Sequence, residues 1–152
     1  MKTRELKFLR DKCLFFNQFM IENGSLPIEM IMSITESNKL IEEAHKNGRL
    51  KPLRTASADI DHQILKNMSI SMVLDLKVFL MKNLQMSLEA IEKVQRKAIS
   101  KVLKKGKVSV VDEYELILNR IYEINNDTNK QVELDQLNTL LTMFDKNAII
   151  KS

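Results

Sequence analysis

Residues 86–107, Met-Ser-Leu-Glu-Ala-Ile-Glu-Lys-Val-Gln-Arg-Lys-Ala-Ile-Ser-Lys-Val-Leu-Lys-Lys-Gly-Lys, contain the clearest structural signal in this sequence. Lysines recur there at four-residue steps along one face of an α-helix, and Gly106 follows a pair of them, as is common where a helix ends. The stretch therefore predicts a basic amphipathic helix over residues 87–105. The opposite face is apolar, with residues at steps of three and four: Leu88, Ile91, Val94, Ala98 and Val102.

The composition favours a helical protein. A chain of 152 residues is long enough for one domain with a stable core. Only three glycines and two prolines occur in it, which leaves few turns and favours long helices over many short strands. We expect an all-α, single-domain bundle of about five to seven helices over residues 1–146, with a frayed tail at 147–152. The predicted helices cover residues 4–22, 27–46, 58–84, 87–105, 110–124 and 130–145.

The sequence leaves some boundaries of these helices undecided. Residues 58–84 are either one long helix or two helices with a break near Asn67–Ser69. Residues 47–56 look most like a loop, because Gly48 and Pro52 interrupt the helical pattern, and we expect this loop to be mobile or to contact a partner. We expect hydroxyl side chains to cap the helix starts, and the candidates are Thr55 or Ser57, Ser87, Ser109 and Thr128.

The last two predicted helices form an antiparallel hairpin. Residues 112–116 and 132–141 resemble the helical hairpin that precedes the DNA-binding domain in some bacterial toxin-neutralising antitoxins. The resemblance covers less than a quarter of the chain and consists mostly of amphipathic helix pattern, so it implies the hairpin and we carry no function over from it.

Charge is distributed unevenly along the chain. Residues 86–107 contain seven basic and two acidic side chains, whereas residues 108–145 contain two basic and eight acidic ones. The basic face either is solvated and pairs with the acidic hairpin, or binds the phosphates of nucleic acid; an acidic protein or a membrane surface is a third possibility. The candidate polyanion-binding residues are Lys93, Arg96, Lys97, Lys101, Lys104, Lys105 and Lys107, together with Arg49, Lys51 and Arg54.

The first predicted helix is rich in phenylalanine. Its apolar stripe is broad, which is typical of a helix covered on more than one side. This helix is either the centre of the core or also a dimer interface, since aromatic residues are enriched in interfaces. The candidate dimer-interface residues are Phe8, Phe15, Phe16 and Phe19.

The sequence offers little for catalysis. Cys13 is the only cysteine, lies on an apolar helical face and is expected to be a buried thiol. Neither of the two histidines has metal-ligand spacing to other ligands, and the glycines lie singly at helix ends rather than in a phosphate-binding loop. We expect no catalytic, metal or cofactor site, no membrane span and a cytoplasmic location.

The hypothesis from sequence is a small non-enzymatic regulatory or adaptor protein. It would act through protein–protein interaction, with another protein or with a second copy of itself. The alternative is a nucleic-acid-binding regulatory protein that uses the basic helix 93–107.

Overall fold

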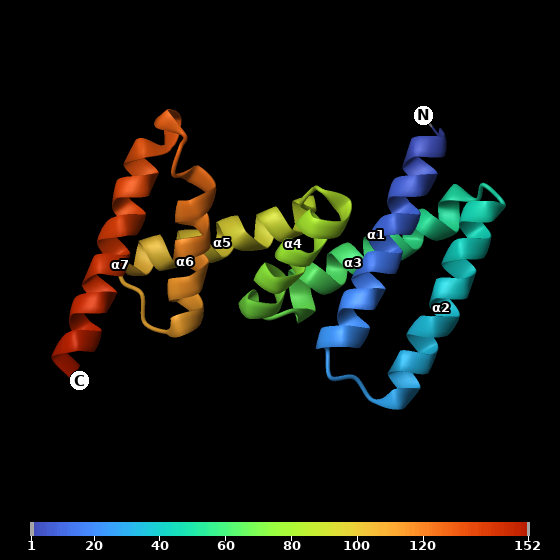
Figure 1. Cartoon of the computed structure of the whole chain (residues 1–152), viewed down its shortest axis with the longest axis horizontal. Helices are drawn as coiled ribbons and strands as arrows, with labels where there is room; N and C mark the ends of the chain where they lie inside the picture. Colours follow the sequence, from blue (N-terminus) through green and yellow to red (C-terminus); the bar gives the residue numbers. More distant parts are fainter. Residues whose placement is uncertain (1, 152) are drawn as a thin grey trace. The chain divides into compact units, whose positions relative to one another are not determined.

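A computed structural model describes the backbone of residues 2–151 and the side chains of residues 2–145. This part of the chain contains seven α-helices and one short 3-10 helix, and no strand (Figure 1). The predicted all-α fold that ends in an antiparallel hairpin is confirmed. The elements are α1 (Lys2–Asn23), α2 (Ile28–Lys46), α3 (Leu50–Asn67), α4 (Ile70–Leu84), α5 (Glu89–Lys105), α6 (Val111–Ile124), η1 (Thr128–Lys130) and α7 (Gln131–Lys151).

The helices form two compact units, residues 1–92 and 93–152, and the boundary lies inside α5. In the first unit α1 is the central helix and packs against α2, α3 and α4. In the second unit α6 and α7 pack together as the hairpin, and the rest of α5 contributes the buried side chains of Ile99 and Val102. The prediction of one domain over residues 1–146 stays a prediction.

The phenylalanines of α1 belong largely to the core of the first unit. Phe16 and Phe19 are each only 2% exposed, and the ring of Phe19 lies 5.7 Å from the ring of Phe79 in α4. Phe15 contacts the same ring edge-on at 6.3 Å. Cys13 is fully buried beside them, as expected. The broad apolar stripe of α1 is therefore explained by its position between three other helices.

One charged side chain of α1 also points into this core. The ammonium group of Lys12, a residue that is 5% exposed, donates to the hydroxyl of Ser57 and to a carboxylate oxygen of Asp61, both at 2.7 Å. Both partners lie on α3. Burying a charge is costly unless it is paired and hydrogen-bonded, and these two contacts meet that requirement. Ser57 is therefore not a helix cap, because it lies in the middle of α3.

The predicted loop at 47–56 is wrong for residues 50–56. Helix α3 begins at Leu50, and only Asn47 to Arg49 separate it from α2. Pro52 is the third residue of α3, where its missing N–H has no helical partner to lose. Gly48 makes the turn, because its φ of 67° lies in the left-handed region, and the following N–H of Arg49 donates to the carbonyl of Ala44 at 2.8 Å.

The open boundary near residue 68 is resolved as two helices. Met68 and Ser69 separate α3 from α4, and the Ser69 hydroxyl accepts from the N–H of Met72. Two other predicted helix caps are wrong. The Ser87 hydroxyl is buried and has no hydrogen-bond partner among the described residues. The residue that caps η1 is Asp127 and not Thr128. Helix α7 continues to Lys151, through most of the predicted tail, whose side chains and final residue lie outside the described residues.

Substitution of Asp61 should test the buried contact of Lys12. In Asp61→Ala the Lys12 ammonium keeps only the Ser57 hydroxyl, so the free energy of unfolding should fall by about 1–3 kcal/mol, measured by urea denaturation. In a Lys12→Met background the same Asp61→Ala change should cost less than about 0.5 kcal/mol, as for an ordinary surface substitution. An equal cost in both backgrounds would show that Asp61 does not act through Lys12.

Candidate functional site

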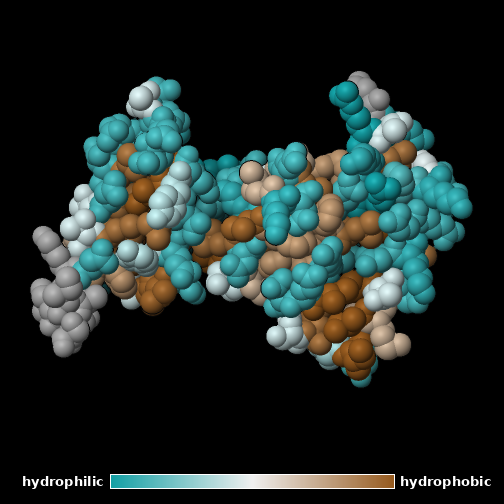
Figure 2. Space-filling model, viewed as in Figure 1, coloured by the Kyte–Doolittle hydropathy of each residue, from teal (hydrophilic) through white to brown (hydrophobic). Residues whose placement is uncertain are grey.

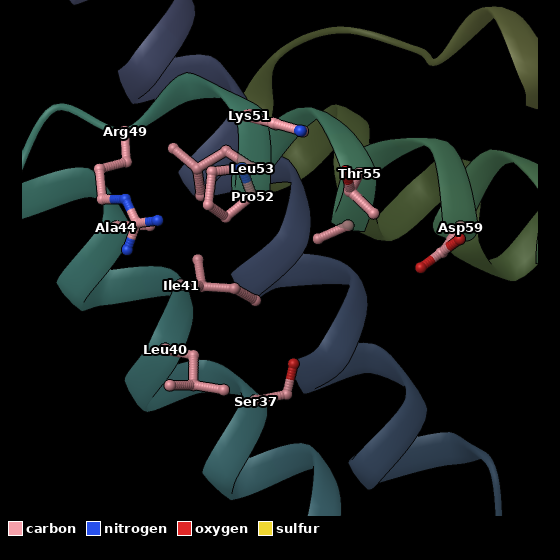
Figure 3. Close-up of a pocket in the computed structure, with 11 residues that line it drawn as sticks. Ser37, Leu40, Ile41, Ala44, Arg49, Lys51, Pro52, Leu53, Thr55 and Asp59 are labelled. Carbon is pink, nitrogen blue, oxygen red and sulfur yellow. The ribbon is translucent and has the colours of Figure 1, made fainter.

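An open groove lies in the angle between α2 and α3, in the first unit (Figure 3). Its volume is about 540 Å³, comparable to that of pockets that hold small ligands or parts of a peptide. Apolar side chains from both helices form most of its lining: Leu40, Ile41, Ala44, Pro52, Leu53 and Ala56. The polar and charged lining residues are Ser37, Arg49, Lys51, Thr55 and Asp59.

The short turn between α2 and α3 creates this groove. Two helices joined by only three residues lie close together at the turn, and Figure 3 shows them diverging away from it. Ile41 and Leu53 are buried and close the bottom of the angle, whereas Leu40 is 67% exposed on its wall. The groove therefore holds an apolar side chain that the first unit leaves uncovered.

Two of the three predicted cations of segment 49–54 lie at the groove. Arg49 and Lys51 are exposed lining residues, and neither has an ion-pair partner among the side chains of residues 2–145. Arg54 is instead bound to α1, where its guanidinium donates to both carboxylate oxygens of Glu5 at 2.7 and 3.0 Å. This hydrogen bonding lowers the pKa of Glu5. Of these three cations, Arg49 and Lys51 therefore lie together at the groove, and Arg54 does not.

The basic face of α5 belongs to the second unit and is exposed as predicted. We call Lys93, Lys97, Lys101 and Lys104 the lysine stripe. These four side chains are exposed, and none has an ion-pair partner within residues 2–145. Lys107 is also exposed, just beyond Gly106, whose φ of 78° ends the helix. Arg96 is exposed too, but it has an interaction of its own.

Lys105, the last residue of α5, pairs with the acidic hairpin. Lys105 Nζ lies 2.7 Å from Glu113 Oε2, and the backbone N–H of Ser109 donates to the same carboxylate at 2.8 Å. Burial acts to raise the pKa of Glu113, but these hydrogen bonds outweigh it and hold the pKa below its ordinary value. Glu113 therefore anchors the start of α6, where a capping role for Ser109 had been predicted.

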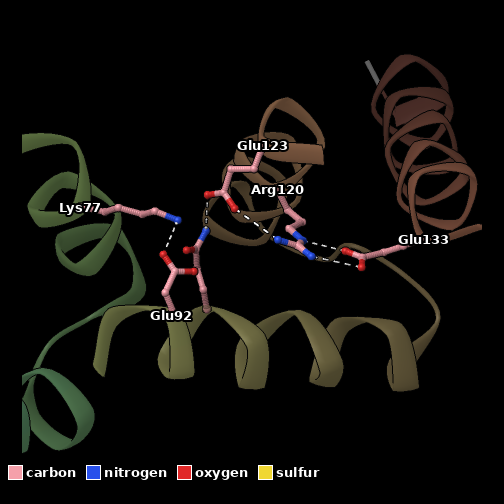
Figure 4. A network of polar contacts seen from close by, with 6 residues as sticks. Lys77, Glu92, Arg120, Glu123 and Glu133 are labelled. Carbon is pink, nitrogen blue, oxygen red and sulfur yellow. Dashed lines mark hydrogen bonds and ion pairs between the residues drawn. The ribbon is translucent and has the colours of Figure 1, made fainter. Parts of the chain in front are cut away.

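Other carboxylates of the hairpin are engaged within it. Figure 4 shows the guanidinium of Arg120 between Glu123 and Glu133. Arg120 Nε lies 2.7 Å from Glu133 Oε2, which links α6 to α7. Gln95 of α5 is only 3% exposed and its amide donates to Glu123 at 3.3 Å. In the first unit, the same figure shows Lys77 of α4 paired with Glu92 at 2.9 Å.

The candidate dimer-interface residues are only partly accessible. Phe16 and Phe19 are buried within a single chain, whereas Phe8 and Phe15 are half-buried. A dimer interface on α1 would thus consist of Phe8 and one side of Phe15. More apolar surface lies where α1 ends and α2 begins (Figure 2), and the exposed apolar residues of that start of α2 are Ile28, Met30 and Met32.

The described residues include no group of three or more His, Cys, Asp or Glu side chains placed to hold a metal ion. Burial raises the pKa of the Cys13 thiol to about 11, which keeps it protonated at neutral pH. His45 lies beside Arg10, with its Nδ1 3.3 Å from Nη1 of the arginine. No helix within the described residues is long and apolar enough to cross a bilayer.

Sequence reasoning missed the groove itself. Ser37 and Leu40 lie off the apolar stripe of α2, and the sequence pattern predicts a loop at Pro52. The signal that could have identified the groove is Leu40, a large apolar residue outside the buried stripe of its helix. An apolar side chain in that position is either a solitary exposed residue or part of a binding surface.

Comparison with known proteins adds no relative: no protein family, curated protein or solved structure is significantly similar to this chain. The geometry of the groove and of the lysine stripe is therefore the basis for inferring a function.

The contact between α6 and α7 should make stability depend on pH. Hydrogen bonds from Arg120 hold the pKa of Glu133 below its ordinary value of 4.5. A carboxyl group with a lowered pKa stabilises the folded state above its unfolded pKa, and this contribution is lost as the pH falls through the folded pKa. The free energy of unfolding should thus decrease below about pH 4.5, and Glu133→Gln should reduce the decrease.

Urea unfolding at a series of pH values between neutral and acidic measures this dependence. The matched control is Glu115→Gln, because Glu115 is exposed on α6 and has no ion pair within residues 2–145. The control should keep the full decrease of the wild type. If both variants follow the same curve, the Arg120–Glu133 contact contributes nothing to the pH dependence.

Proposed function

We propose that this protein is a non-enzymatic binding protein of the regulatory or adaptor kind, and that a segment of a partner protein docks in the groove between α2 and α3. The observation that carries the proposal is the groove's combination of an apolar lining with two cations, Arg49 and Lys51, that have no ion pair among the side chains of residues 2–145. The occupant we infer is an amphipathic segment with apolar side chains toward the groove and carboxylates at one end.

The apolar part of the lining supplies the driving force. Leu40 is exposed, and covering such a side chain completely contributes about 1.5–3 kcal/mol from the hydrophobic effect. Leu53 and Ile41 are already buried, so they shape the bottom of the groove and do not contribute new buried area. A helix laid into such a groove makes its contacts with residues spaced three and four apart.

The charged residues set the direction of the bound segment. Arg49 and Lys51 lie beside the α2–α3 turn, and Asp59 lies eight residues further along α3 than Lys51, or about 12 Å at 1.5 Å per residue. Carboxylates of the partner should therefore lie near the turn, and a cation near Asp59. Electrostatic complementarity of this kind fixes orientation and selects partners more than it adds affinity.

The same two cations had been candidates for binding nucleic acid. Two features favour a peptide at this surface: the lining between the cations and Asp59 is mostly apolar, and Asp59 would repel phosphates. Arg54, the third predicted cation, is bound to Glu5. The groove thus offers two cations and one carboxylate around an apolar centre, which matches a protein segment better than a phosphate chain.

Selection of binders from a library of random peptides, with the full chain as bait, tests the proposal. The enriched peptides should combine apolar residues at helical spacing with Asp or Glu near one end. Leu40→Glu should weaken their binding at least about tenfold, equivalent to the loss of about 1.4 kcal/mol. The matched control is Met32→Glu, because Met32 is 63% exposed on the same helix but does not line the groove.

A charge reversal distinguishes binding of peptides in the groove from nonspecific binding elsewhere on the protein. Arg49→Glu with Lys51→Glu should turn the selection toward basic peptides, whereas Lys46→Glu, at an exposed position of α2 outside the groove, should leave it unchanged. The proposal is wrong if no peptide is enriched, or if the enriched peptides bind the Leu40→Glu and Met32→Glu variants equally well.

A further inference from the structure

We propose that the lysine stripe of α5 is a contact surface for the phosphate backbone of nucleic acid, which it binds without reading the base sequence. This surface lies in the second unit and is independent of the groove in the first. The inference rests on the alignment of the four lysines, on their lack of ion-pair partners among the described side chains, and on what surrounds them.

The four lysines lie in a row along one face of α5. They follow one another at steps of four, four and three residues, and consecutive members four residues apart are separated by about 6 Å along the helix axis. Each strand of a duplex carries one phosphate per about 3.4 Å of the duplex axis, so several phosphates fall within the length of such a row. The row spans about 16 Å at 1.5 Å per residue. It can therefore follow one strand over several nucleotides.

Among the side chains of residues 93–145, no carboxylate forms an ion pair with the row. Residues 93–107 contain no carboxylate. In the hairpin, Glu113 is bound to Lys105, and Glu133 is bound to Arg120. Within residues 2–145 the four lysines have no ion pair. Folding thus leaves the four lysines available to displace the counterions condensed on nucleic acid, whose release drives binding.

The surroundings of the row provide little for reading bases, because Arg96 is exposed but already has an interaction of its own. Recognition of base edges uses mainly Arg, Asn and Gln, which form paired hydrogen bonds in the grooves. Gln95, the nearest amide, is buried and donates to Glu123. The row itself consists of lysines, with Arg96 and Ser100 between them. Lysine is a flexible point charge suited to phosphates, so binding should be insensitive to sequence.

The buried side of α5 argues against a membrane surface as the partner. A helix that lies on a bilayer places its apolar face among the lipids. Here Ile99 and Val102, on the apolar face of α5, are 7% and 2% exposed. The exposed side offers charge without an apolar residue to insert. A polymer of phosphates in water is the ligand that this surface fits.

Fluorescence anisotropy with a labelled DNA duplex of mixed sequence tests the inference on the full chain. With four phosphates contacted, the logarithm of the binding constant should fall with the logarithm of salt concentration at a slope of about −3.6. Affinity should therefore drop roughly a hundredfold between about 50 and 200 mM salt. A second duplex of different sequence should bind equally well.

Charge reversal identifies the surface responsible. Lys97→Glu with Lys101→Glu and Lys104→Glu should abolish binding, whereas the same change at Lys46, Lys66 and Lys82, three exposed lysines of the first unit, should leave it within about twofold. The single variant Lys101→Ala, which should leave the fold intact, should lower the salt slope by about 0.9.

Four outcomes would overturn the inference. These are no binding by the wild type even at low salt, equal losses in the two triple variants, an unchanged salt slope in Lys101→Ala, and a strong preference for one duplex sequence. Binding to vesicles that contain phosphatidylserine, without binding to DNA, would show that a membrane is the partner instead.

Discussion

The buried ammonium group of Lys12 imposes the strictest requirement on the first unit. A charge in this position has to be met by polar atoms, and both of them, from Ser57 and Asp61, come from α3. The contact therefore fixes which side of α3 faces α1. Leu53 and Ile60, four and three residues from Ser57, and Ile64, four residues after Ile60, lie on that side and become core.

The orientation of α3 in turn determines the groove. Once Ser57 and its neighbours face α1, the residues on the adjacent side of α3, Pro52, Thr55 and Asp59, face the angle toward α2. Helix α2 is held close by the short turn at Gly48, so its Leu40 and Ala44 line the opposite wall. The groove thus follows from two local facts, a buried charge and a three-residue turn.

Two classes of cation in this protein have different physical roles. Lys12, Arg54, Lys105 and Arg120 join helices by pairing with a carboxylate on another helix. Arg49, Lys51 and the lysine stripe are exposed without such a partner within the described residues. The cations of the first class hold helices together, and those of the second class support the two binding proposals. Composition does not distinguish the two classes, because the distance between a cation and a carboxylate on another helix depends on how the helices pack.

The sequence by itself determined the helices and the direction of their apolar and basic faces. These features follow from local periodicity, so the basic helix, the hairpin and the buried Cys13 could be predicted. Pro52 was misread because the same residue stops one helix or starts another, and local sequence does not separate the two cases. Lys12 was missed as a core residue because its burial depends on Asp61, 49 residues away in the chain.

Only the tertiary structure decided which exposed residues lie together. It removed Phe16 and Phe19 from the candidate interface by packing them among α1 and its neighbours, and it separated Arg54 from Arg49 and Lys51. It also joined Leu40 to residues of α3 to make a groove that no periodicity indicates. The physical reason is that periodicity orients a side chain on its own helix, whereas the partner that covers it is set by long-range packing.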